Sequence, residues 1–423
     1  MQKMVSPLTR EIVPIFFLRR QAFLGPDGLM EKYLKPLLAM MGLSHVRTKF
    51  LTHVFVLFLS MRGRLNFANM ARYGTYSEKS YRTHFEESFP FFMFNLHLIQ
   101  QVSSASRLIV ADCTFLPKSG KATPHIGRFW NGCVGKAMPG LELSTVAVVD
   151  IEKHTAFHLE SLLTPGARQD EESRIDVYVK QITDRATELK RLADYLVYDG
   201  AAGKKKFVDG IVDHTELHLI SKLRKDADLR YLYTGPRRSG PGRPKQYDGK
   251  INCTQLDLSR VERCYEDDEI TIFTAVVNSK RFKRNIRIAY IQHRATKGYT
   301  ILFSTDLTLD GYLIYYYYHL RFQVEFLFRD GKQHTGLTHC QARSEQKLSF
   351  HHNASLTAVS LAKADFYADD QNAGQPFSML DITTSYFNQL YVNRIFDKLG
   401  LEPTSDTLAP LYQELLNFGK LAA

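Results

Sequence analysis

Four polar residues in the last third of the chain have types and a spacing that suit phosphate chemistry. They are Tyr318, Arg321, Glu325 and Lys332. On an α-helix, at about 100° per residue, their side chains fall within one stripe about 60° wide. A carboxylate beside a guanidinium, an ammonium and a phenol suits a site that binds a metal ion and a phosphodiester together. Glu325 would hold the metal, while Arg321 and Lys332 would bind phosphate oxygens.

The same spacing also suits an exposed helix face, because Arg321 and Glu325 at i,i+4 form an ordinary surface pair. The flanking sequence argues against that alternative. Residues 315–329 are rich in tyrosine and phenylalanine, too aromatic for a free surface helix. A polar stripe on an apolar helix is better explained by a cleft. We therefore predict one helix across residues 318–332 whose polar stripe faces a site.

Two further acids end short apolar runs that predict β-strands. Asp112 ends the run that starts at Arg107, and Asp199 ends the run that starts at Tyr195. Taken singly, each acid is more simply a strand end or a turn residue. Strand ends of one sheet lie side by side, however, so Asp112 and Asp199 can converge with Glu325.

Three carboxylates gathered at one place repel one another unless cations bind among them. Hard oxygen ligands favour Mg²⁺, with Mn²⁺ as a substitute, over zinc. Two such ions about 4 Å apart stabilise both the attacking and the leaving oxygen of an in-line phosphoryl transfer. The pattern therefore predicts Asp112, Asp199 and Glu325 as catalytic metal ligands.

Composition favours a nucleic-acid partner. The 423 residues carry a net charge of +11, and 44% of them are hydrophobic, which excludes wholesale disorder. A basic excess suits a polyanion, most often nucleic acid. An anionic membrane surface is the alternative, but no basic amphipathic helix stands out. The longest apolar stretch, residues 50–61, is too short to cross a bilayer.

Cysteine usage and the N-terminal sequence favour a cytoplasmic protein. The five cysteines are scattered and contain no Cys-x-x-Cys pattern, which argues against a zinc site or a disulfide framework. The N-terminus lacks the features of a signal peptide.

The periodicity along the chain predicts four regions around an α/β core. Residues 1–100 read as a helical DNA-binding region, 101–224 with 301–345 as a mixed α/β catalytic core, 225–300 as a β-rich basic insertion and 346–423 as a helical C-terminal region. Strands in the core and the insertion are expected near residues 107–114, 141–151, 155–163, 195–198, 218–224, 229–233, 270–277 and 301–306.

A short segment in the N-terminal region resembles a helix-turn-helix. Residues 66–85 contain a helical stretch, a glycine-containing turn and a second helical stretch, with Ser77 as its expected N-cap. Such a unit would place its second helix in a DNA major groove. A small helical bundle that only packs is the alternative.

With these residues, the chain resembles a large group of bacterial insertion-sequence DDE transposases. The Tyr-x2-Arg-x3-Glu-x6-Lys pattern that ends at Lys332 looks like their YREK signature. Ala111-Asp112-Cys-Thr and Val197-Tyr-Asp199-Gly-Ala are similar to their first-acid and second-acid strands. Residues 129–143 are similar to the hairpin after the first acid, and residues 303–307 to the strand before the catalytic helix.

The resemblance implies an RNase H-like core that is interrupted by a β-rich insertion. It implies the metal-ligand role for Asp112, Asp199 and Glu325, and contacts to the transposon-end phosphates for Tyr318, Arg321 and Lys332. It also implies a homodimer that holds two DNA ends. Gly331 departs from a good helix, because glycine weakens a helix by about 1 kcal/mol relative to alanine, so Lys332 is expected near a fraying end.

Three basic clusters predict contacts to the DNA backbone. Lys204 and Lys205 follow Asp199 closely, and residues 280–287, which include Arg284, alternate cations along an expected strand. The segment 237–245 resembles the core of an AT-hook, although a mobile basic hairpin tip is the simpler alternative for reading sequence. Its cations are Arg237, Arg238, Arg243 and Lys245.

The sequence therefore predicts a cytoplasmic, nucleoid-associated transposase that uses Mg²⁺ and double-stranded DNA. One rival is an RNase H-like nuclease or resolvase that cuts without joining strands. The other is a DNA-binding derivative that has lost catalysis, which the presence of all three acids argues against. The only tryptophan, Trp130, is expected in the core more readily than as a base-stacking platform.

Overall fold

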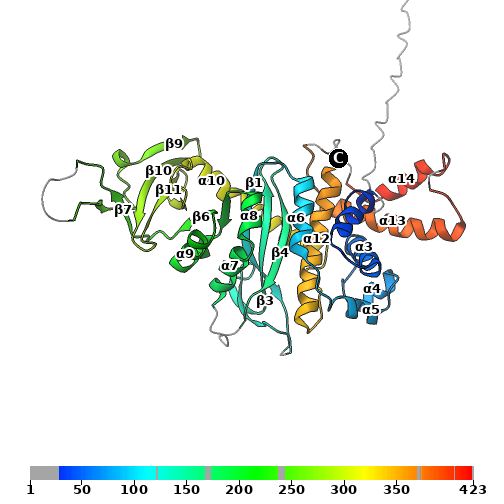
Figure 1. Cartoon of the computed structure of the whole chain (residues 1–423). Helices are drawn as coiled ribbons and strands as arrows, with labels where there is room; N and C mark the ends of the chain where they lie inside the picture. Colours follow the sequence, from blue (N-terminus) through cyan, green and yellow to red (C-terminus); the bar gives the residue numbers. More distant parts are fainter. Residues whose placement is uncertain are drawn as a thin grey trace, which may run out of the picture.

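The structure is a computed structural model. It describes residues 28–120, 122–166, 173–236, 243–368, 372, 374–403 and 405–421. Within them all strands join one mixed sheet of twelve strands, with helices at both ends of the chain. Figure 1 shows the strands of the insertion at one end of the molecule and the terminal helices at the other. The predicted mixed α/β class is thereby confirmed. No described helix is both long and apolar enough to span a bilayer.

Five strands form the part of the sheet that holds the first two acids. β1 (Arg107–Pro117) pairs antiparallel with β3 (Lys136–Asp150), which pairs antiparallel with β4 (Thr155–Leu163). On its other side β1 pairs parallel with β5 (Tyr195–Tyr198), and β5 pairs parallel with β6 (His218–Leu223). The order β4-β3-β1-β5-β6 fits the RNase H-like core that the resemblance implied. The apolar runs in β1 and β5 are buried, as strands in the middle of a covered sheet must be.

The strands of the predicted insertion continue the same sheet. β12 (Tyr299–Ser304) pairs with β6 on one side and with β11 (Arg284–His293) on the other, and β11 pairs with β10 (Ile270–Ser279). The remaining strands are β2 (Gly127–Asn131), β7 (Leu229–Leu232), β8 (Tyr247–Lys250) and β9 (Glu262–Glu266). The prediction of one strand across the basic run 280–287 is wrong in its first half, because residues 280–283 form the turn between β10 and β11.

From residue 28 on, the N-terminal region is helical, as predicted, and residues 1–27 lie outside the described part of the chain. A capped pair of short helices lies at residues 67–84: Ser77 Oγ accepts a hydrogen bond from the backbone N–H of Ser80 at 3.2 Å, which confirms Ser77 as an N-cap. Tyr81 of the second helix is buried and is hydrogen-bonded to His53. The elements are η1 (Met30–Leu34), α2 (Lys35–Met40), α3 (His45–Ser60), α4 (Phe67–Tyr73), α5 (Glu78–His84) and α6 (Phe91–Val102).

The helices after α6 cover the sheet or form the C-terminal region. α12 is buried around most of its circumference and lies between β4 and α3 (Figure 1), which explains its lack of a polar face. The bounds are α7 (Arg174–Thr183), α8 (Ala186–Leu192), η2 (Gly200–Ala202), α9 (Lys205–His214), η3 (Leu258–Arg260), α10 (Gly311–Leu320), α11 (Gln323–Gln333), α12 (Glu345–Tyr367), α13 (Met379–Leu399) and α14 (Ala409–Asn417).

Candidate active site

The first two acids lie at the same level of two neighbouring parallel strands. In the β1–β5 pair, Ala111 is the Cα partner of Tyr198. The next residue of each strand is therefore Asp112 on one side and Asp199 on the other. Neighbouring strands lie about 4.8 Å apart, so the register brings together two acids that are far apart in the sequence.

Each of these carboxylates is fixed by a local backbone contact. Asp112 Oδ1 accepts a hydrogen bond from the N–H of Cys113 at 2.8 Å. Asp199 caps the turn η2, where its Oδ1 accepts from the N–H of Ala201 at 2.9 Å. The Asp-Gly dipeptide at 199–200 thus forms a turn, as the simpler interpretation predicted. In this turn the Asp199 carboxylate remains beside β1.

The helix that was predicted to carry the polar stripe is two helices. α10 ends at Leu320 and α11 begins at Gln323. Between them the backbone hydrogen bonds shorten to i→i+3, as in Arg321 N–H to Tyr318 O at 3.3 Å and Glu325 N–H to Phe322 O at 3.0 Å. This tighter turn interrupts the α-helical period. The prediction of one continuous helical stripe is therefore wrong.

The break turns Arg321 toward the sheet, where it contacts two of the three acids. Its Nη1 donates to Asp112 Oδ2, and its Nη2 donates to Glu325 Oε1 at 3.3 Å. The Arg321 side chain is only 9% exposed and that of Asp112 15%, whereas Glu325 is half exposed. The pair between Arg321 and Glu325 is thus not the ordinary surface pair of the alternative interpretation, because the guanidinium is buried and shared.

The charges at this site act strongly on one another. Burial raises the pKa of Asp112 to about 6 against the opposing effect of Arg321, and the nearby carboxylates of Asp199 and Glu325 raise it further. Burial also opposes the charge on Arg321, but Asp112, Tyr318 and the other two acids outweigh it and raise the pKa of the guanidinium. The three acids therefore lie close enough to share the field of one cation.

Tyr318 and Lys332 border the same site. The Arg321 guanidinium lies 5.7 Å from the centre of the Tyr318 ring. Lys332 lies in the last turn of α11, where its Nζ donates to Thr114 Oγ1 at 2.7 Å. Lys332 thus lies near the helix end, as expected, and α11 continues through Gly331 to Gln333. A side chain at Gly331 would meet Leu356 of α12 at 2.9 Å, so the glycine permits close helix packing.

Thr114 was not predicted as part of the site. It lies two residues after Asp112 on β1, and residues i and i+2 of a strand share one face. This alternation was the signal in the sequence that could have placed Thr114 at the site. It identifies Thr114 only when Lys332 is also known to lie over that face.

The donor set fits a hard divalent cation, although no ligating cluster is formed. Among the described residues, no group of three or more His, Cys, Asp or Glu side chains is arranged to hold a metal ion. The mutual repulsion that helps to raise the pKa of Asp112 is what a divalent cation between the acids would relieve. Arg321 supplies a single positive charge between Asp112 and Glu325. It therefore offsets part of the repulsion that a divalent cation would relieve.

The basic clusters differ in how many of their cations already pair with carboxylates of the protein. Lys204 is exposed at the start of α9. Lys205 pairs with Asp209, and Arg284 donates to Asp209 Oδ1 at 2.9 Å and to Asp213 Oδ1 at 3.1 Å. These contacts hold α9 to β11.

In the AT-hook-like segment, Arg237 and Arg238 lie outside the described residues. Arg243 and Lys245 are exposed. Lys245 donates to Asp248 Oδ1 at 2.6 Å, and Arg243 to Gln246 Oε1 at 3.2 Å.

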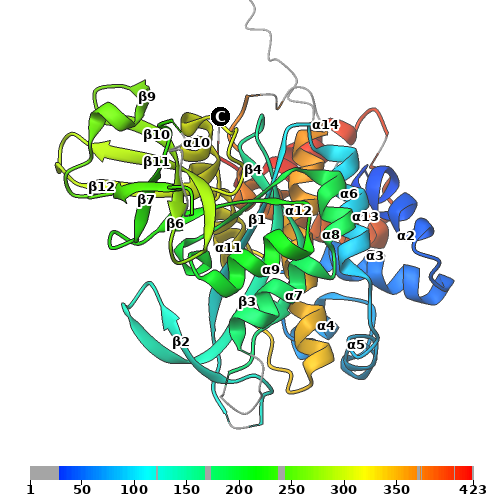
Figure 2. The same ribbon diagram turned by 60° about the vertical axis from the view of Figure 1, so that its left-hand side comes forward.

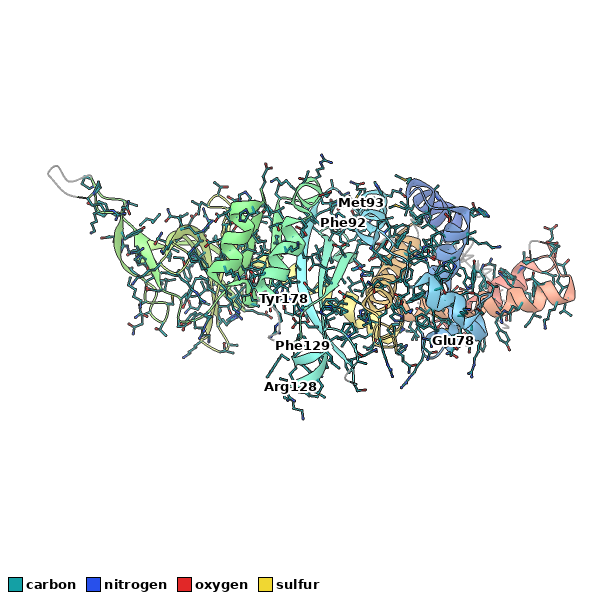
Figure 3. The ribbon with its side chains drawn as sticks, turned by 60° about the horizontal axis from the view of Figure 1, so that its bottom comes forward. Glu78, Phe92, Met93, Arg128, Phe129 and Tyr178 are labelled. Atoms are coloured by element: carbon teal, nitrogen blue, oxygen red, sulfur yellow. The ribbon has the colours of Figure 1, made fainter. Side chains whose placement is uncertain are left out.

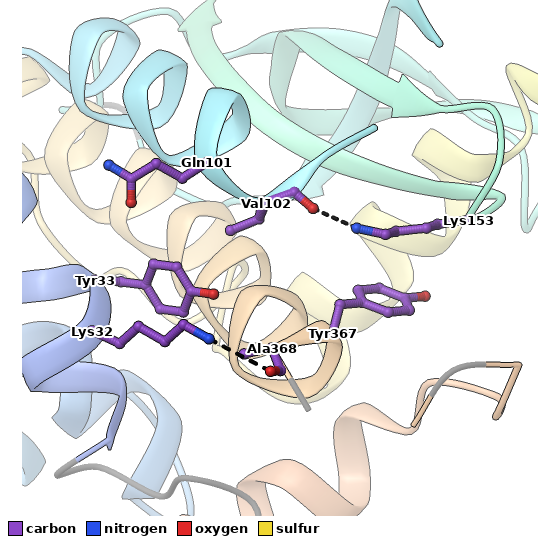
Figure 4. Close-up of a pocket in the computed structure, with 7 residues that line it drawn as sticks. All are labelled: Lys32, Tyr33, Gln101, Val102, Lys153, Tyr367 and Ala368. Carbon is purple, nitrogen blue, oxygen red and sulfur yellow. Dashed lines mark hydrogen bonds between the residues drawn. The ribbon is translucent and has the colours of Figure 1, made fainter. Parts of the chain in front are cut away.

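Two other features lie apart from the acids. The prediction that Trp130 lies in the core is wrong, because it is 66% exposed on β2. An open pocket of about 410 Å³ separates η1 from the end of α6 (Figure 4), and its lysines donate to main-chain carbonyls. Its lining consists of Lys32, Tyr33, Gln101, Val102, Lys153, Tyr367 and Ala368.

Comparison with known proteins finds one matching family model and several similar solved chains, of which one is described below. Residues 94–275, less than half of the chain, match the family described as DDE superfamily endonuclease. The matched segment contains Asp112 and Asp199 and ends before Glu325, so this part of the chain is similar to a DDE endonuclease domain. No curated protein matches the chain.

The solved structure is entitled "Cryo-EM structure of piggyBac transposase synaptic complex with hairpin DNA". The match has a TM-score of 0.38 and 11% sequence identity, and it covers 94% of this chain and 84% of that chain. A likeness this low does not bear on the site.

Proposed function

We propose that this chain is a DNA transposase of the bacterial insertion-sequence group with the YREK signature. It would bind the terminal inverted repeats of its element, hydrolyse the phosphodiester at each end and join the freed 3′-hydroxyl to target DNA. The observation that carries the proposal is the buried guanidinium of Arg321, which contacts Asp112 and Glu325, together with the strand register that puts Asp199 next to Asp112. The match of residues 94–275 to DDE superfamily endonucleases supports it.

Asp112, Asp199 and Glu325 would hold Mg²⁺, the metal typical of that superfamily, with Mn²⁺ as a substitute. When bound, the metal would activate the attacking oxygen and neutralise the leaving oxygen. In the first step a water oxygen attacks phosphorus, the bond to the 3′-oxygen breaks, and that oxygen leaves as a hydroxyl after it gains a proton. In the second step this 3′-hydroxyl attacks a target phosphodiester and takes the place of its leaving 3′-oxygen.

The cationic and phenolic side chains would position the DNA for both steps. Arg321 can exchange a carboxylate for a phosphate oxygen, because its planar fork suits either group. Lys332 is a compact charge beside β1 that can reach a neighbouring phosphate, with Thr114 as its resting partner. Tyr318 offers a phenol at the same edge.

The remaining parts of the proposal concern the whole chain. Residues 1–100 would help to bind the inverted repeats, 101–224 and 301–345 would form the catalytic core, 225–300 would contact the DNA backbone, and 346–423 would support a homodimer. The cations of the basic clusters would hold DNA by charge, and Lys204, Arg243 and Lys245 are among their exposed members. Such a protein would work in the cytoplasm on nucleoid DNA.

The decisive experiment uses DNA ends taken from the genomic flanks of the gene, where inverted repeats bracketed by short direct duplications are expected. Purified protein is incubated with Mg²⁺, a pre-cleaved end that carries a 3′-hydroxyl and a supercoiled target plasmid. Joined products support a transposase. Cut ends that are never joined would point to a nuclease or resolvase instead.

The site assignment is tested with Asp112→Asn, Asp199→Asn and Glu325→Gln. Each variant should still bind the end DNA while cleavage falls by at least about a thousandfold, since metal-held charge contributes several kcal/mol to such a reaction. Asp306→Asn is the matched control. Asp306 follows β12, and its carboxylate accepts from Tyr195 at the start of β5, the opposite end from Asp199. Equal loss in the control, or full cleavage by Asp112→Asn, would refute the assignment.

A further inference from the structure

The hairpin formed by β2 and the first residues of β3 projects from the molecule as an arm (Figure 2), which we define as residues 127–140. Its base is a Gly127–Gly140 pair that is closed to side chains. A Cβ at Gly127 would meet the Gly166 carbonyl oxygen at 2.2 Å, and one at Gly140 would meet the Leu116 carbonyl oxygen at 2.5 Å. Such close backbone approach is a common reason for glycine in a strand, and here it fixes where the arm leaves the sheet.

The two faces of the arm differ. Phe129 is buried under the Arg174 guanidinium, which lies 5.3 Å from its ring centre. Arg128 and Trp130 alternate with Phe129, so both lie on the opposite face. In Figure 3, Arg128 lies at the outer edge of the molecule, with Phe129 between it and Tyr178.

The exposed face is built around an uncovered indole. The residue paired with Trp130 across the hairpin is Ala137, whose small side chain cannot cover the ring. Trp130 is 66% exposed, and Val134 in the turn is also exposed. A large exposed aromatic on a projecting hairpin marks a contact surface more often than a packing defect.

The charge of the arm identifies the kind of partner. No Asp or Glu occurs between Asp112 and Glu142, whereas the arm carries Arg128 on the face of the indole and Lys136 next to its turn, opposite Asn131. Neither cation forms an ion pair with a carboxylate of the described residues. An acid-free cationic surface with an aromatic ring at its centre suits a nucleic acid, whose phosphates bind the cations and whose bases stack on the ring.

The arm continues the strand ladder that carries the first acid. Gly140 at its base pairs with Pro117, five residues after Asp112 on β1. Lys332 of the site binds Thr114, which lies between those two positions on β1. A DNA strand that reaches Asp112 and runs on along β1 would therefore meet the arm.

We propose that Trp130 stacks on an unpaired base of the DNA strand that lies in the active site, and that Arg128, on the same face of the arm, binds an adjoining phosphate. This inference rests on the proposed function, since it names a DNA contact next to the same site. An indole cannot stack between paired bases without unstacking them, so an unpaired base at a strand end is the substrate feature that the arm fits.

The single tryptophan makes the test direct, because all tryptophan emission comes from the arm. The full-length protein is titrated, without divalent metal, with two dye-labelled duplexes of equal length, one blunt and one with a short single-stranded overhang. Dye anisotropy reports binding, and tryptophan emission reports Trp130. We expect emission to be quenched on binding, and more strongly by the overhang duplex.

Variants separate stacking from folding. Trp130→Ala should weaken binding of the overhang duplex by about 5- to 100-fold, since stacking contributes that much per base. Trp130→Phe should restore most of the affinity. Tyr391→Ala removes an aromatic side chain of similar exposure on α13 and should change nothing. Thermal melting confirms that each variant is folded.

The outcomes also separate this inference from the proposed function. Anisotropy that rises while tryptophan emission stays constant overturns the arm's role and leaves the transposase proposal standing. Quenching that depends on protein concentration without DNA would assign the arm to a second copy of this chain and also overturn the inference. No DNA binding at all overturns both proposals, whereas unchanged cleavage by Asp112→Asn sinks only the catalytic assignment.

Discussion

Arg321 is the residue on which the geometry of the candidate site depends. Its guanidinium is buried, its two terminal nitrogens contact different carboxylates, and its Nε has no hydrogen-bond partner among the described residues. An isolated buried charge is costly, so Arg321 and the acids stabilise one another. The guanidinium thus holds Asp112 and Glu325 together.

The first prediction concerns Arg321→Lys. The change keeps the charge, but a single ammonium cannot reproduce the two-pronged contact to Asp112 and Glu325. We expect cleavage to fall by about tenfold or more, with a loss of about 1–2 kcal/mol in the free energy of unfolding. Cleavage assays and urea denaturation measure the two effects.

Arg329→Lys is the control for Arg321→Lys, because Arg329 lies on α11 close to the site, and its exposed guanidinium contacts Asp330 and the Phe326 ring but none of the three acids. Cleavage reduced equally in both variants would mean that the shared contact of Arg321 is unimportant.

The second prediction concerns Asp365, a buried acid of α12 that accepts a hydrogen bond from Tyr386 at 2.8 Å. Burial raises its pKa to about 7. The folded state then holds a proton that the unfolded state releases near pH 4, so stability falls as pH rises from about 4 to 7. Asp365→Asn mimics the protonated form and should remove that loss.

Urea denaturation at pH 5 and pH 8 measures the effect. Asp365→Asn should be more stable than the original chain at pH 8, by on the order of 2–4 kcal/mol, with a smaller gain at pH 5. An equal gain at both pH values would contradict the pKa shift.

At the scale of elements, local pattern predicted most strands and the N-cap of α5. β4 was predicted at its observed bounds, and the apolar runs that end in Asp112 and Asp199 both became strands. The break at Arg321 was not predictable in this way, because residues 312–330 contain neither a glycine nor a proline to mark it. Only the contact of Arg321 with Asp112, a partner from a distant strand, selects the tighter turn.

The exposure of Trp130 was missed for a related reason. Tryptophan is apolar enough to suggest a core position, but the arm leaves the sheet at Gly127 and Gly140. The absence of acids around it was visible in the sequence. That absence acquires meaning only when the hairpin is seen to project.

α12 covers the open edge of β4 with side chains instead of another strand. Asn353 accepts from the N–H of Ser161 at 2.8 Å and donates to its carbonyl oxygen at 3.0 Å, and Lys363 donates to the Ala156 carbonyl oxygen at 2.7 Å. An uncovered edge strand exposes unpaired backbone groups and invites association. α12 therefore ends the sheet on this side and protects it.

The third prediction follows from this edge. Asn353→Ala leaves the N–H and the carbonyl of Ser161 buried without their partner, and it should lower the free energy of unfolding by about 2–4 kcal/mol. Urea denaturation measures the change. Asn417→Ala, on exposed α14, is the control and should stay within about 0.5 kcal/mol. A loss below about 1 kcal/mol for Asn353→Ala would show that water replaces the amide at the edge.

At the scale of the whole molecule, the regions expected at the two ends of the sequence pack together. α3 packs against both α12 and α13. Arg62 donates to Thr384 at 2.9 Å, and Arg394 donates to the carbonyl oxygen of Tyr73, the last residue of α4. The helix-turn-helix-like pair α4 and α5 is therefore in contact with the C-terminal helix α13 through Tyr73. Such contacts join residues more than 300 positions apart, and no local pattern encodes them.

The last prediction concerns the net charge of +11. A protein that binds DNA through several phosphate contacts releases counterions, so the logarithm of its association constant falls with the logarithm of the salt concentration by about 0.9 per contact. We expect a slope of about −4 or steeper for duplex DNA, measured by dye anisotropy over a salt series. Arg243→Ala combined with Lys245→Ala should reduce the slope by up to about 2.

Lys180→Ala combined with Lys190→Ala is the matched control, because it removes the same charge from two lysines that pair with Asp184 and Asp194 on the surface. If DNA phosphates contact Arg243 and Lys245 specifically, this control variant should keep the original slope. An equal reduction in both variants would mean that DNA responds to the total charge of the molecule alone. A nearly flat dependence in the unmodified chain would remove the basic clusters from the DNA-binding surface altogether.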